Sequence, residues 1–159
     1  MSHVELAARW LKKAKSDLNT ATHMFNDVWP KELDISCYHS QQAVEKALKG
    51  YLVYHNYNPP YTHDLAVLCS CCAEFDKSFQ TRMETCVALT EYATRTRYPD
   101  DFDIEEAETD RVIRHAYEMF DYILDFLPDL ACVFRPEDNP DEEQEQDDEN
   151  QEQGGLTLQ

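Results

Sequence analysis

Glycine is scarce in this sequence, with three residues in 159, and two of them are Gly154 and Gly155 near the C-terminus. A β-sandwich or β-barrel needs many glycine-containing turns, so this scarcity argues against an all-β fold. It also leaves no glycine-rich loop that could cradle a phosphate, which excludes a P-loop nucleoside triphosphatase.

Long apolar runs are also missing. No stretch approaches the ~18–20 consecutive apolar residues of a membrane span, and residues 1–18 resemble an amphipathic helix rather than a signal peptide. We therefore expect a cytoplasmic protein that does not enter a membrane. Without a secretory signal, the six cysteines are expected to be reduced and mostly buried thiols rather than disulfides.

Basic residues are outnumbered, 14 against 32 acidic ones, for a formal net charge of −18. Ten of the acidic residues and no basic residue lie in 136–159, which leaves 22 acidic and 14 basic residues, a net −8, in 1–135. Such a body has no general affinity for phosphate backbones, although a local basic patch stays open. We expect residues 131–159 to form a disordered acidic tail, which either solubilises the protein or binds a basic partner surface.

Helical periodicity is what the sequence has in abundance. Apolar residues recur at spacings of three and four along five segments, at about 2–26, 33–55, 64–75, 77–96 and 104–127. These spacings predict an all-α fold, an up-and-down bundle of four to five helices over residues 1–130, whose first two helices form an antiparallel hairpin. The first helix is expected to bury Leu6, Trp10, Ala14, Leu18, Ala21 and Phe25. The second is expected to bury Ile35, Tyr38, Val44, Leu48, Tyr51 and Leu52.

Four motifs lie in order on these helices and their links: residues 8–18, 37–49 (CYHSQQAVEKALK), 62–65 (THDL) and 97–100 (RYPD). Together they resemble the HEPN domain family (higher eukaryotes and prokaryotes nucleotide-binding), in its small stand-alone prokaryotic type, over roughly residues 5–127. The resemblance implies a helical bundle, often a homodimer, that binds a nucleotide or a partner protein. The partner it suggests is a minimal nucleotidyltransferase in a toxin–antitoxin-like pair.

Many HEPN domains are metal-independent ribonucleases, whose signature is an arginine, four to six intervening residues, and a histidine. Histidine can move a proton near neutral pH, and arginine can neutralise a phosphate in the transition state. Here Arg111 and His115 are separated by three residues, one of them Arg114. This departure favours a non-catalytic module, in which Arg111 and His115 form ordinary surface ion pairs with Glu108 or Glu118. The alternative is a ribonuclease with a degenerate site built from Arg111, Arg114 and His115.

Gln41, Glu45 and Lys49 follow one another at intervals of four residues, on one stripe of the second predicted helix. One interpretation is a polar seam in which Glu45 and Lys49 form an ion pair. The other is a binding cleft lined by Gln41, Glu45, Lys46, Lys49, His63, Arg97 and Tyr98. Within that set, Arg97 could reach the carboxylate of Glu45.

Metal ligands are sparse. Cys69 and Cys72 are three residues apart on a predicted helix and His63 precedes them, but a structural zinc site needs a second ligand pair. We expect neither a metal nor a cofactor.

Overall fold

A computed structural model of the chain describes residues 1–96, 99 and 103–135, and all regular structure in those residues is helical. Its elements are α1 (His3–Asn26), α2 (Leu33–Tyr54), α3 (Leu65–Ala73), η1 (Lys77–Arg82), α4 (Met83–Thr90), η2 (Glu91–Ala93), α5 (Glu106–Asp125) and α6 (Pro128–Phe134). The predicted all-α helical bundle is confirmed. Residues 1–123 form one compact unit, and residues from 124 onward form a second one.

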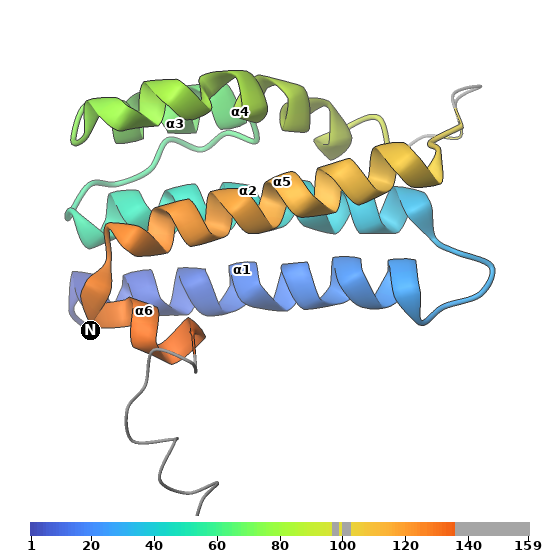
Figure 1. The fold of residues 1–159 in the computed structure, drawn as a ribbon. Helices are drawn as coiled ribbons and strands as arrows, with labels where there is room; N and C mark the ends of the chain where they lie inside the picture. Colours follow the sequence, from blue (N-terminus) through green and yellow to red (C-terminus); the bar gives the residue numbers. More distant parts are fainter. Residues whose placement is uncertain (97–98, 100–102, 136–159) are drawn as a thin grey trace, which may run out of the picture. The chain divides into compact units, whose positions relative to one another are not determined.

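The first two helices form the antiparallel hairpin predicted for them (Figure 1). A capping box begins α1: Ser2 Oγ accepts from the amide of Glu5, and the amide of Ser2 donates to Glu5 Oε2 at 2.7 Å. These two bonds satisfy amides that the first helical turn leaves without partners. The chain then turns through residues 27–32, which include Pro30, and enters α2.

Gly50 brings the two helices of the hairpin into close contact. A Cβ at this position would lie 3.2 Å from the Cβ of Trp10 and 3.4 Å from Cδ2 of Leu11. Glycine is unfavourable inside a helix, but here the missing side chain lets α1 approach the backbone of α2. Ala7 and Leu11, which face this position, are fully buried.

The remaining helices of the first unit pack against this hairpin. Cys37 Sγ donates to Thr109 Oγ1 at 3.6 Å, and the hydroxyls of Thr22 and Tyr117 are 3.0 Å apart, so α5 contacts both α2 and α1. Phe79 of η1 is buried, with its ring 4.6 Å from that of Tyr51. This aromatic contact joins the η1–α4 layer to the core of the hairpin.

Two expectations about core-facing residues are wrong. The buried stripe of α1 begins at Ala7 and Leu11, whereas Leu6 is exposed and Trp10 and Phe25 are half-buried. Trp10 Cβ and Leu11 both lie at the contact with Gly50, but only Leu11 is fully buried there. At the start of α2, Ile35 is 37% exposed and Tyr38 is half-buried, because nothing in the described part of the chain covers them fully.

The fourth predicted helix is divided into three pieces, the 3₁₀ segment η1, the short helix α4 and the 3₁₀ turn η2. Asp76 Oδ1 accepts from the amide of Ser78, and Thr81 Oγ1 donates to the carbonyl of Ser78. Such local side-chain bonds compete with the α-helical pattern, so the segment begins as a 3₁₀ helix.

The second unit contains the end of α5 and the helix α6, which has Pro128 at its first turn. Arg135 closes this stretch with an ion pair to Asp125 at 2.9 Å. The helix continues to Phe134, past residue 130 where the predicted bundle ends; residues 136–159 of the predicted tail lie outside the described residues. None of the helices in the described ranges is long and apolar enough to cross a membrane.

Candidate functional site

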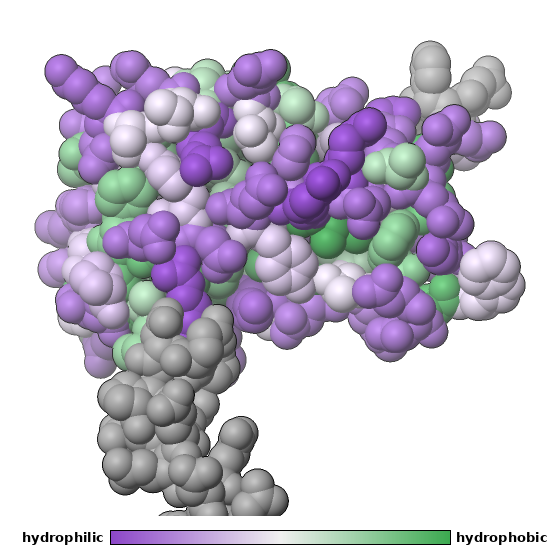
Figure 2. Space-filling view, viewed as in Figure 1, coloured by the Kyte–Doolittle hydropathy of each residue, from purple (hydrophilic) through white to green (hydrophobic). Residues whose placement is uncertain are grey.

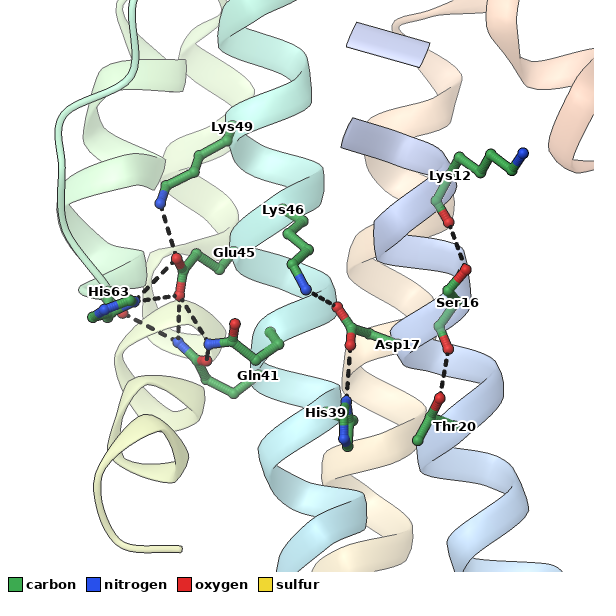
Figure 3. Close-up of polar contacts among 11 residues, drawn as sticks. Lys12, Ser16, Asp17, Thr20, His39, Gln41, Glu45, Lys46, Lys49 and His63 are labelled. Atoms are coloured by element: carbon green, nitrogen blue, oxygen red, sulfur yellow. Dashed lines mark hydrogen bonds and ion pairs between the residues drawn. The ribbon is translucent and has the colours of Figure 1, made fainter. Parts of the chain in front are cut away.

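The buried carboxylate of Glu45, near the middle of α2, is the centre of the main polar cluster (Figure 3). Lys49 Nζ donates to Glu45 Oε1 at 2.9 Å, and His63 Nδ1 lies 3.1 and 3.0 Å from the two carboxylate oxygens. The Glu45 side chain is 5% exposed and that of Lys49 is 11% exposed, whereas His63 is 57% exposed. An ion pair between a buried carboxylate and a largely covered lysine is therefore contacted by an exposed histidine.

Two glutamines complete this Glu45 cluster. Gln42 Nε2 donates to Glu45 Oε2 at 3.2 Å and to Gln41 Oε1 at 2.8 Å. Gln41 Nε2 donates to the carbonyl of His63 at 3.1 Å, which ties the α2–α3 link to α2. The polar atoms of the cluster thus bond mainly to one another, as buried polar groups must to offset their desolvation.

Lys46 belongs to a different cluster. The predicted cleft groups it with Glu45, but the structure directs it toward α1, where Nζ donates to Asp17 Oδ2. Asp17 Oδ1 lies 2.8 Å from His39 Nδ1, so one carboxylate of α1 holds two side chains of α2 (Figure 3). Asp17 is buried, and its two cationic or hydrogen-bonding partners make that burial tolerable.

Arg97 and Tyr98 lie outside the described residues, so the predicted contact between Arg97 and Glu45 stays a prediction. The neighbouring Arg95 donates to Glu108 Oε1 at 2.7 Å, and the hydroxyl of Tyr92 donates to the same oxygen at 2.6 Å. Burial raises the pKa of Glu108, but the bonds from Tyr92 and Arg95 lower it more, so its pKa lies below the ordinary value of 4.5.

The candidate catalytic residues lie on α5 away from any such cluster. Arg111 and Arg114 are exposed and His115 is half-buried. Arg114 Nη2 lies 3.9 Å from Asp110 on the exposed surface of the helix. Glu108, one of the two predicted partners of Arg111 and His115, is instead bonded to Arg95 and Tyr92. The geometry gives His115 no carboxylate partner among the described residues that would orient it for proton transfer.

A pocket of about 390 Å³ opens beside the first turns of α2. Its lining residues are Asp34, Ile35, Tyr38, His39 and Thr96. The predicted site contains none of these residues. The sequence carries one signal for this pocket. Asp17 lies on the inner side of α1, where a carboxylate needs a partner, and its partner His39 lines the pocket.

Metal binding finds no support in the described ranges, where no three or more His, Cys, Asp or Glu side chains are grouped so that they could hold an ion. All six cysteines are unpaired. Cys37, Cys69, Cys72 and Cys86 are buried, and the mostly buried thiols expected from the sequence are confirmed. Burial raises the pKa of the Cys37 thiol to about 11, despite an opposing hydrogen bond with Thr109.

Comparison with known proteins agrees with this architecture. The chain is similar to the crystal structure of TT1696 from Thermus thermophilus, with a TM-score of 0.66 and 22% sequence identity over 75% of this chain and 96% of that one. This likeness supports the fold. A comparison with curated proteins finds no match. The family model described as HEPN domain matches residues 7–126. This range includes all four motifs found in the sequence and covers most of the chain. The chain therefore belongs to the HEPN domain family.

Proposed function

We propose that this chain is a non-catalytic HEPN module that binds a partner protein. The class of partner that the family resemblance suggests is a minimal nucleotidyltransferase, in a toxin–antitoxin-like pair. The observation that carries the proposal is the closed state of the Glu45 cluster. Its carboxylate bonds to Lys49, His63 and Gln42, so these groups stabilise the fold rather than await a substrate.

The residues of the ribonuclease alternative support catalysis poorly. Arg111 and Arg114 are exposed on one helix, and Arg114 is paired with Asp110. General acid–base catalysis needs a histidine held in a productive orientation, with donors aimed at the reacting phosphate. His115 has no such orienting group among the described residues, and its helical spacing from Arg111 departs from that of the family's ribonucleases.

The experiment that tests the proposal is incubation of the purified full chain with total RNA, alongside His115→Ala and His39→Ala variants. His39 is included because the Asp17 carboxylate lies 2.8 Å from its Nδ1 and because it lines the pocket beside α2. We expect no cleavage by the wild-type protein in a sample whose helical folding is verified by circular dichroism. Cleavage that is lost in either variant would overturn the proposal and establish a ribonuclease.

A nucleotide ligand is the second arm of the same test. Isothermal titration of the full chain with ATP, GTP and their monophosphates measures it directly. We expect no saturable heat, because Lys49 and Lys46, the two lysines of the predicted cleft, are already paired with carboxylates. Saturable binding that is lost in Lys49→Met would instead identify the module as nucleotide-binding.

A further inference from the structure

We infer that the pocket formed by Asp34, Ile35, Tyr38, His39 and Thr96 is the docking site for an arginine side chain of the partner protein. This inference rests on the proposed function and specifies the chemistry of the contact. The pocket shares no lining residue with the Glu45 cluster or with the candidate catalytic residues of α5. Its occupant follows from the groups that line it, from the ion pairs of the neighbouring elements, and from the exposed apolar residues of α2 and of the link before it.

The charged side chain of the pocket is Asp34, and a carboxylate only accepts hydrogen bonds. Asp34 is an exposed carboxylate in the first turn of α2. His39 lines the same pocket, and its Nδ1 lies 2.8 Å from Asp17 Oδ1. A ligand with several N–H donors complements the Asp34 carboxylate, which has two acceptor oxygens.

The charges nearby favour a cation. Lys31 is paired with Glu106 at 3.2 Å, and Arg95 is paired with Glu108 at 2.7 Å. Lys46 is paired with Asp17. Asp34, in contrast, forms no ion pair with any residue in the described part of the chain. Among the described residues the pocket therefore offers a negative charge without an ion-pair partner, which attracts a cation and repels a phosphate.

A guanidinium group suits the pocket better than an ammonium. It is planar, carries five N–H donors in a fixed arrangement, and stacks on aromatic rings. Tyr38 supplies an aromatic ring and Ile35 an apolar wall, while Asp34 supplies carboxylate acceptors. An ammonium group is more strongly hydrated and gains less from such a wall.

Exposed apolar side chains indicate that the arginine belongs to a protein. Trp29, in the α1–α2 link, is 83% exposed, and Ile35 on the rim of the pocket is 37% exposed. Figure 2 shows one face of the molecule that is mostly hydrophilic, with apolar patches between the polar side chains. Tryptophan and arginine are enriched at the energetic centres of protein interfaces. Trp29 lies in the link that leads directly into the helix carrying Asp34 and Tyr38.

The test uses N-acetyl-leucyl-arginine amide as the probe, followed by NMR amide shifts of the ¹⁵N-labelled full chain. Two matched probes replace the arginine by citrulline, which is neutral, or by lysine. We expect saturable shifts at residues 34–39 with the arginine probe, and about tenfold weaker binding of the citrulline probe. Equal binding of the arginine and citrulline probes would overturn the inference.

Variants of the full chain locate the contact. Asp34→Asn is expected to weaken the arginine probe about tenfold, whereas Glu118→Gln, an exposed carboxylate on α5, leaves binding unchanged. Equal loss in both variants would indicate general electrostatic attraction and overturn the inference. The amide spectrum of each variant shows at once whether it is folded, so a loss of binding cannot be confused with unfolding.

A final arm separates a protein partner from a small guanidinium compound. N-acetyl-arginine amide lacks the leucine, and we expect it to bind about fivefold more weakly than the leucine-containing probe, with this gain lost in Trp29→Ala. Equal binding of the two probes, with no effect of Trp29→Ala, would identify a site for small guanidinium compounds and would overturn the inference that the arginine belongs to a partner protein. RNA cleavage by the wild-type protein would contradict the proposed function, whether or not the peptide probes bind. If the peptide probes do not bind, only the arginine site is contradicted, and the proposal of a non-catalytic module is unaffected.

Discussion

Glu45 and Lys49 form an ion pair of 2.9 Å one helical turn apart on α2, with Glu45 buried and the Lys49 side chain only 11% exposed. An exposed pair at this spacing contributes only about 0.2–0.5 kcal/mol. This pair differs because a buried charge that loses its partner has no water to replace it. The cluster is therefore a point where single substitutions have large effects.

Glu45→Gln is expected to lower the free energy of unfolding by about 2–3 kcal/mol. The variant leaves the Lys49 ammonium buried without its carboxylate and weakens the bond to His63. Urea unfolding followed by circular dichroism measures the change. The exposed Glu74→Gln is the matched control and should stay within about 0.5 kcal/mol of wild type. A Glu45→Gln effect no larger than that of the control would contradict the structural role of the cluster.

Glu108 makes stability depend on pH in the acidic range. Its pKa is lower in the folded chain than the ordinary 4.5, so its contribution is fully present above that value and is lost as the pH falls through the folded pKa. Glu108→Gln should therefore cost about 1 kcal/mol at pH 7. The gap between variant and wild type should narrow steadily below about pH 4.5. Urea unfolding at pH 7, 5, 4 and 3 tests this, and a gap that is unchanged at pH 3 would exclude the predicted linkage.

The cysteines should differ sharply in reactivity. Cys132 is exposed and Cys71 is half-buried, whereas Cys37 and the other three are buried. Burial and the raised pKa of Cys37, about 11, keep that thiol protonated and out of reach of alkylating reagents at pH 8. Iodoacetamide labelling read by peptide mass spectrometry should find Cys132 modified first and Cys71 next. Early modification of Cys37 in the folded protein would refute this order.

Sequence periodicity predicted the core best where one helix has a strongly one-sided apolar face. On α5 the apolar residues spaced three and four apart, Val112, Ala116, Met119, Phe120 and Ile123, are all buried. On α1 the predicted face is wrong by one residue at Leu6 and Trp10, since Ala7 and Leu11 are the fully buried residues where α1 meets Gly50 of α2. The apolar periodicity of α1 carries no information about the position of Gly50 on α2, so it could not predict this contact.

The polar clusters show the same limit. Gln41, Glu45 and Lys49 meet because residues four apart lie on one side of a helix. Lys46 follows Glu45 by one position, which rotates it about 100° around the helix axis, toward α1 and Asp17. The bond between Asp17 and His39 joins two helices, so no spacing along either helix could reveal it.

Asp17 bonds to two residues of α2, His39 and Lys46, that are seven positions apart. Seven positions span about 10 Å along a helix, and the carboxylate reaches both only when it lies between them. Sliding α1 along α2 by one turn, about 5.4 Å, would break at least one of the two bonds. The Asp17 carboxylate therefore fixes the longitudinal register of α1 against α2. It also makes the position of His39, which lines the pocket, depend on the alignment of the two helices.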